Sequence, residues 1–166
     1  MLEYNFFGRE NMRNFIYDII YGGICSLTVL IVGLVLPRRW FNPDNKLFSE
    51  RKWENGGRVY SKFHVNKWKH RLPDMSRYIS SMIAKRLHHN ETTDHIKRLI
   101  AETCVAEAAH FVLIILSLGM IVIWTSAGGV ICCLCYAAGN VPYIIIQRYN
   151  RPRLVRMMKR MESKGC

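Results

Sequence analysis

Residues 108–146 read AAHFVLIILSLGMIVIWTSAGGVICCLCYAAGNVPYIII and contain no aspartate, glutamate, lysine or arginine. Thr125 and Ser126 divide this stretch into two apolar runs, 108–124 and 127–146. A helix rises about 1.5 Å per residue and the hydrocarbon core of a bilayer is about 30 Å thick, so each run approaches the length that crosses a membrane. We therefore predict a hairpin of two transmembrane helices joined by a minimal turn.

A third apolar run, residues 15–36, precedes the hairpin. A proline and two arginines follow it, where a signal peptide would carry small residues for cleavage, so we interpret the run as a retained anchor. The 166-residue chain contains no linker-like stretch and suggests one domain. The predicted fold is an all-α integral membrane protein with three transmembrane helices. Residues 37–107 form a cytoplasmic segment with one or two interfacial helices, and residues 147–166 form a cytoplasmic tail.

The basic residues predict the orientation of the chain. Its formal net charge is +12, and most lysines and arginines lie in residues 37–107 or after Gln147. Because lysine and arginine favour the cytoplasmic side, we predict a cell-membrane protein with its N-terminus outside and its central segment and C-terminus inside. This topology accounts for much of the positive charge, so anionic lipid headgroups are the expected partners and nucleic acid is not.

The central segment contains two helical patterns. Apolar residues recur at helical spacing from Met75 to Leu87, with basic residues on the other face, which is typical of a helix lying on a membrane surface. Thr93 is suited to cap a new helix that continues into the run 108–124.

The cysteines predict neither a disulfide framework nor a metal site. Six are present, and four of them lie in the apolar runs. The grouping of Cys132, Cys133 and Cys135 lacks the paired spacing and the histidine partners of a zinc site. We expect these thiols to pack as small apolar groups.

Glu107 and His110 are the first candidate catalytic pair. They are three residues apart, so they share one face of a helix at the point where the run 108–124 begins. Ionisable groups in membrane segments are candidates for function by default. The carboxylate would orient His110 as a general base. The alternatives are a pair that only fixes helix packing and a pair that binds metal.

His70 and Asp74 form a second candidate pair; three residues separate them, and Asp74 directly precedes the pattern that starts at Met75. A neutral imidazole could remove a proton from a hydroxyl while the carboxylate holds the ring. In the alternative interpretation Asp74 caps the following helix and His70 faces phosphate headgroups.

The stretch from Asn140 onward carries a third set of candidates. Asn140 could donate to an oxyanion, or it could serve the helix backbone that Pro142 leaves without a donor. Five polar residues follow at the membrane boundary and could bind the phosphates of a co-substrate: Gln147, Arg148, Asn150, Arg151 and Arg153. Anchoring against anionic lipids is the alternative, but it requires charge and no particular amides.

Three blocks, residues 67–74, 102–110 and 140–154, together resemble the glycosyl-diaponeurosporenoate acyltransferases of staphyloxanthin-type carotenoid synthesis. The resemblance covers roughly residues 60–154. It implies transfer of a fatty acyl group to a sugar hydroxyl of a membrane glycolipid, such as a glycosyl carotenoid. It also implies that acyl-CoA or an acyl-carrier thioester is the co-substrate, with no cofactor bound permanently. A covalent acyl-enzyme is not expected, because no serine or cysteine lies in a nucleophile elbow.

Two other functions are compatible with the same residues. The chain could be another small lipid-modifying membrane enzyme, such as a methyltransferase or a reductase, and the cofactor that copurifies would distinguish it. It could also be a non-catalytic basic scaffold, which would tolerate substitution of Glu107 and His110.

Overall fold

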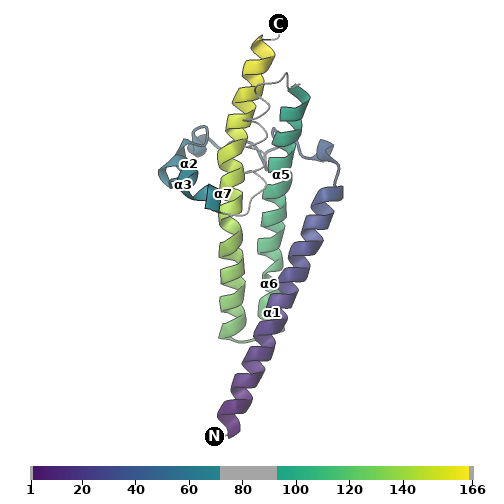
Figure 1. Ribbon diagram of the computed structural model, residues 1–166, viewed down its shortest axis with the longest axis vertical. Helices are drawn as coiled ribbons and strands as arrows, with labels where there is room; N and C mark the ends of the chain where they lie inside the picture. Colours follow the sequence, from purple (N-terminus) through teal and green to yellow (C-terminus); the bar gives the residue numbers. More distant parts are fainter. Residues whose placement is uncertain (1, 72–92, 165–166) are drawn as a thin grey trace. The chain divides into compact units, whose positions relative to one another are not determined.

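The computed structural model describes residues 2–71 and 93–164, and every secondary-structure element in them is a helix (Figure 1). The all-α prediction is therefore confirmed. The chain divides into two compact units. The first contains Met1–Leu36 and Ala108–Pro142, and the second contains Pro37–Glu107 and Tyr143–Cys166.

Three stretches of the described residues are long and apolar enough to cross a membrane: Gly8–Val35, Thr93–Ile123 and Ala127–Ser163. They correspond to the helices α1 (Leu2–Val35), α5 (Thr93–Leu116) with α6 (Leu118–Ile123), and α7 (Ala127–Lys164). The predicted run 15–36 coincides with the later part of α1, the run 108–124 with the end of α5 and with α6, and the run 127–146 with the first part of α7. In particular, the predicted tail after residue 146 continues α7 as a helix, which also runs through Pro142 and Pro152.

The predicted hairpin turn is present in the first unit. Helix α6 ends at Ile123 and α7 begins at Ala127. The hydroxyl of Ser126 accepts a hydrogen bond from the amide of Gly128 at 3.2 Å, so one of the first amides of α7 has a partner.

Helix α1 packs against α6 in the first unit, at an interruption that separates α5 from α6. The amide of Met120 bonds the carbonyl of Ser117, three residues back, instead of the carbonyl of Leu116. The hydroxyl of Tyr21 in α1 donates to that Leu116 carbonyl at 2.9 Å. Because hydrocarbon offers no water to a backbone carbonyl, this tyrosine stabilises the interruption. The apolar pattern of residues 108–124 gives no sign of it.

The second unit is built around the later part of α7. Its short helices are η1 (Arg38–Trp40), η2 (Lys52–Glu54), α2 (Arg58–Lys62), α3 (Val65–Trp68) and η3 (Lys69–Arg71). One buried cluster joins Tyr60 and Val65 to Ile146 and Tyr149. A second joins Ile96, Leu99 and Ile100 of α5 to Leu154 of α7.

A left-handed turn follows η2 and positions the end of that helix. Asn55, Gly56 and Gly57 all have positive φ angles, of 47°, 67° and 78°. A Cβ atom on Gly57 would lie 3.3 Å from the carbonyl oxygen of Tyr149, so the turn approaches the backbone of α7 closely. The residue before this turn, Glu54, is thereby placed in the interior of the second unit.

Candidate active site

His110 and Asn140 form a hydrogen-bonded pair in the first unit. His110 lies on α5 and Asn140 on α7, and the His110 Nδ1 atom is 2.8 Å from the Asn140 Oδ1 atom. The Asn140 amide nitrogen donates to the carbonyl of Tyr136 at 2.8 Å. The amide nitrogen is thus directed at an acceptor, and its oxygen is left to accept from His110. In this arrangement Nδ1 is the donor of the hydrogen bond between the two side chains.

This pair brings together two of the residues that the sequence singled out separately. Both are polar residues inside apolar runs, and they lie about equally far from the hairpin turn in sequence. In two antiparallel helices such residues lie at the same level. Asn140 provides a hydrogen bond that orients the His110 ring, the role that the sequence suggests for Glu107.

Glu107 belongs to a buried ion cluster in the second unit, which comprises Glu54, Glu107, Arg148 and Arg151. One Glu107 oxygen accepts from Arg148 Nε at 2.7 Å, and the other pairs with Arg151. Arg148 Nη1 donates to Glu54 at 2.8 Å. Acidic and basic groups thus alternate, and none of these side chains is more than 13% exposed. Burial of such charges is tolerated only when they are paired.

The two arginines of the ion cluster direct their remaining donors to other protein acceptors. Arg148 Nη2 donates to the carbonyl of Leu47 at 3.0 Å, and Arg151 Nη1 donates to the carbonyl of Phe48 at 2.7 Å. Arg151 also bonds the hydroxyl and the carbonyl of Thr103 at 3.0 and 3.1 Å. Both guanidinium groups therefore hold the fold of the second unit together, although the sequence suggested that they bind phosphate.

Glu54 is the member of the ion cluster that the sequence analysis missed. Besides Arg148, it accepts from the Tyr60 hydroxyl at 2.5 Å and from the Arg51 amide at 2.6 Å. Burial alone would raise the pKa of Glu54, but these three donors outweigh it and lower that pKa. Burial, together with the neighbouring Glu54 carboxylate, raises the pKa of Tyr60. The only sequence signal was the Asn-Gly-Gly turn that follows Glu54.

Acidification should weaken the second unit through Glu54. Because its pKa is lower in the folded than in the unfolded protein, the unfolded chain binds more protons, and stability is lost as the pH falls below about 4.3. We expect the unfolding temperature of the purified wild-type protein to fall as the pH is lowered below about 4.3. The unfolding temperature of Glu54→Gln should fall less steeply. Equal slopes for the two proteins would contradict the assignment.

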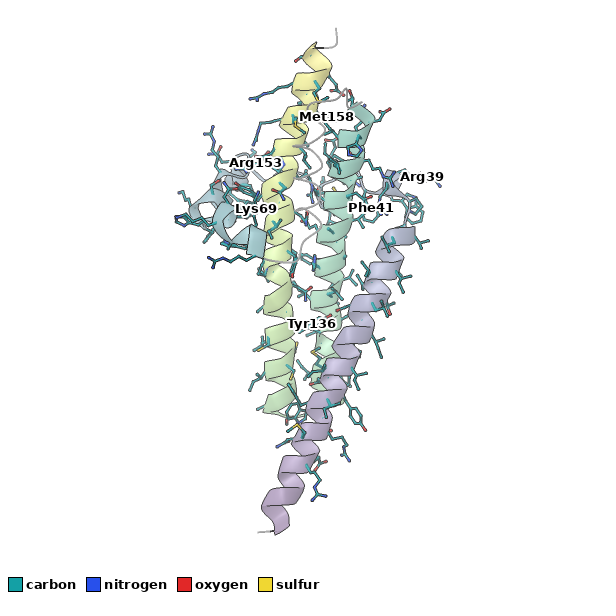
Figure 2. The ribbon with its side chains drawn as sticks, in the orientation of Figure 1. Arg39, Phe41, Lys69, Tyr136, Arg153 and Met158 are labelled. Carbon is teal, nitrogen blue, oxygen red and sulfur yellow. The ribbon has the colours of Figure 1, made fainter. Side chains whose placement is uncertain are left out.

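The other predicted boundary residues differ in their surroundings. Gln147 is buried, Asn150 is half-buried and Arg153 is exposed. Arg153 and Lys69 both lie over the ring of the buried Tyr149, at 3.6 and 5.2 Å from its centroid. The two cations are labelled in Figure 2. Arg153 is thus available to solvent while being held by a cation–π contact.

The second candidate pair is only partly described. His70 lies within η3, and nothing is described of its side chain. Asp74 and the predicted helix from Met75 to Leu87 lie outside the described residues. The proposal that His70 and Asp74 act together stays a prediction.

A cleft of about 230 Å³ opens in the second unit beside the ion cluster. Glu54, Arg148 and Arg151 are among its lining residues. The rest of its wall comes from the loop before η2 and from the later turns of α7: Pro43, Asp44, Phe48, Ser49, Glu50, Pro152, Val155, Arg156 and Lys159.

Comparison with known proteins identifies the family. The family model of glycosyl-4,4'-diaponeurosporenoate acyltransferases matches residues 37–160. The chain belongs to this family. The glycosyl-4,4'-diaponeurosporenoate acyltransferase of Staphylococcus aureus strain Newman is 31% identical over 150 residues, which cover 88% of each chain. The enzymes of strains N315 and USA300 are 30% identical over the same share. No solved structure shows a significant match.

Membership of this acyltransferase family settles the broad class of the protein. It is an acyltransferase with the three apolar helices of a multi-pass membrane protein. The match to the family model includes His110, Asn140 and all four members of the ion cluster. It does not include α1, which precedes residue 37.

Proposed function

We propose that this acyltransferase moves a fatty acyl group from a thioester donor to a sugar hydroxyl of a glycosylated carotenoid in the membrane. The Staphylococcus aureus relatives are named for a glycosyl-4,4'-diaponeurosporenoate, and that name supports this class of acceptor. Family membership favours acyl transfer over the methyltransferase, reductase and scaffold alternatives. The observation that carries the mechanism is the hydrogen bond between His110 and Asn140.

His110 acts as the general base in this proposal. Its Nε2 atom accepts the proton of the acceptor hydroxyl while the hydroxyl oxygen attacks the thioester carbonyl. The tetrahedral intermediate then collapses, its carbon–sulfur bond breaks, and the leaving thiolate takes the proton back from Nε2. The products are an ester and a thiol, and no acyl group is attached to the protein at any stage.

Asn140 acts as a positioning residue. Its oxygen fixes the proton on Nδ1 and orients the ring, while its nitrogen is anchored on the carbonyl of Tyr136. A neutral amide does this without adding a buried negative charge in a membrane-spanning helix, where such a charge is costly. We therefore assign Asn140 to the ring rather than to the oxyanion.

The proposed topology places the donor on the cytoplasmic side. The N-terminus faces outward, and the basic residues of the central segment and of the end of α7 face the cytoplasm. Exposed cations such as Arg153 and Arg160 then meet anionic headgroups of the cell membrane. Acceptor lipid diffuses in the bilayer, whereas the thioester donor arrives from water.

Lipid mass spectrometry of whole cells tests the proposed function. A host that makes a glycosylated carotenoid would express the wild-type chain or the variant His110→Gln, with equal amounts of each confirmed in the membrane. We expect the carotenoid glycoside to gain the mass of a fatty acyl group only with the wild-type chain. An unmodified carotenoid glycoside in both cultures, with the new acyl ester on another lipid, would overturn the proposed acceptor.

A further inference from the structure

The cleft beside the ion cluster combines three kinds of side chain. Two carboxylates, Asp44 and Glu50, come from the loop before η2. Two cations, Arg156 and Lys159, come from α7. Apolar contacts come from Pro43, Pro152 and Val155. A ligand that uses the whole cleft therefore needs an anionic group, hydrogen-bond donors and an apolar surface.

The ion cluster itself offers little net charge to such a ligand. Arg148 and Arg151 are paired with Glu54 and Glu107, and their guanidinium groups already donate to protein acceptors on several sides. The cations that remain for an anion are Arg156 and Lys159. Both are exposed, and they lie three residues apart, so they are neighbours on one face of α7.

Gly56 links the acidic and basic sides of the cleft. Its amide donates to a carboxylate oxygen of Glu50, and its carbonyl accepts from Arg156 Nη2 at 3.2 Å. These contacts fix Glu50 and Arg156 on either side of the left-handed turn. Glu50 and Asp44 are negatively charged, so they would repel a phosphate group placed against them. Because a carboxylate accepts hydrogen bonds, they would bind hydroxyl or amino groups instead.

We infer that this cleft binds the phosphorylated ribonucleotide of coenzyme A, so that acyl-CoA is the donor. Phosphate would lie against Arg156 and Lys159, the free ribose 2′-hydroxyl or the base amino group would donate to Asp44 or Glu50, and the base would pack on the prolines. Acidic side chains bind ribose hydroxyls in the same way in dinucleotide-binding folds. A carrier protein presents its acyl group on phosphopantetheine, which has a phosphate but no nucleotide. It would therefore leave the carboxylates and the prolines of the cleft without a ligand group. The step from nucleotide binding to acyl donation rests on the proposed function.

A ligand-binding measurement tests this inference without requiring acyl transfer. The wild-type protein in nanodiscs of zwitterionic lipid would be titrated with coenzyme A and with pantetheine. We expect Arg156→Gln and Lys159→Gln each to raise the Kd for coenzyme A about threefold, as for exposed ion pairs, and to leave pantetheine unchanged. Asp44→Asn and Glu50→Gln should also raise the Kd for coenzyme A. Arg160→Gln is the matched control, since Arg160 is an exposed cation of α7 outside the cleft lining.

Three results would overturn the inference. An unchanged Kd for coenzyme A in all four cleft variants would place the nucleotide elsewhere. Loss of the Arg156 and Lys159 effects when anionic lipid is added, with coenzyme A still bound, would assign these cations to lipid headgroups. Methyl glucoside binding that weakens in the four cleft variants, while the Kd for coenzyme A stays unchanged, would make the cleft a sugar site. Coenzyme A binding that weakens in the variants, in a protein that acylates no acceptor, would instead refute the proposed function alone.

Discussion

His110→Gln is expected to lower kcat for acyl transfer about 100- to 10,000-fold, the range that a general base contributes. Glutamine retains the size and the polarity of the side chain but cannot take up a proton at the position of Nε2. Because the glutamine amide occupies the position of Nε2 rather than that of Nδ1, the hydrogen bond to Asn140 is altered, and the folding of the variant is measured alongside its activity. The measurement is the initial rate of ester formation by purified protein, normalised to the amount of folded enzyme.

Two other histidines serve as comparisons for His110. His64 is exposed in the turn between α2 and α3, and His64→Asn should leave the rate unchanged because asparagine tolerates its left-handed backbone. His70→Gln tests the second candidate base. If His70→Gln abolished activity while His110→Gln stayed within twofold of wild type, the base would be His70 and our assignment would be wrong.

Glu107→Ala is expected to reduce the free energy of unfolding by about 3–5 kcal/mol, because it leaves buried charges without a partner. Glu107 is 4% exposed and accepts from both Arg148 and Arg151. Arg148 would retain its ion pair with Glu54, but Arg151 would lose its only ion-pair partner among the described residues. Denaturant unfolding of the purified protein in detergent gives the comparison.

Glu102→Ala is the matched control, since Glu102 lies on the same helix and pairs with Arg38 at 2.7 Å. That pair is partly exposed, so its loss should cost at most about 1 kcal/mol. If Glu107→Ala were as stable as Glu102→Ala but inactive, Glu107 would have a catalytic role and the ion cluster would not be its main function.

The membrane helices could be predicted because they depend on local sequence alone. A run of about twenty apolar residues needs no partner to be recognised, and Thr125 and Ser126, which divide residues 108–146 into two such runs, indicate the turn. The interruption at Ser117 could not be predicted in this way. It depends on Tyr21, a residue of another helix, whose hydroxyl stabilises a carbonyl that the interruption leaves without its usual partner.

The candidate site could be predicted as a set of residues but not as a set of contacts. A polar residue inside an apolar run is conspicuous, so His110 and Asn140 were found. Their pairing depends on the register of α5 against α7, which a list of conspicuous residues does not contain. Glu107 and His110 are three residues apart on one helix, and this spacing suggested that their side chains pair. In the structure the buried Glu107 carboxylate lies against two arginines of α7. Glu54 could not be singled out, because a glutamate in a polar loop is usually solvated and the Asn-Gly-Gly turn that follows it does not reveal burial.

We propose that this acyltransferase acts on a glycosylated carotenoid and uses His110 as the base. The most direct measurement is mass spectrometry of a reaction that contains purified protein in nanodiscs, an isotope-labelled acyl-CoA and a glycosylated carotenoid acid. We predict that the labelled acyl group appears on the sugar with wild-type protein and is at least about a hundredfold slower to appear with His110→Gln. Labelled product formed at the same rate by folded His110→Gln, or none formed by folded wild-type protein, would contradict the account.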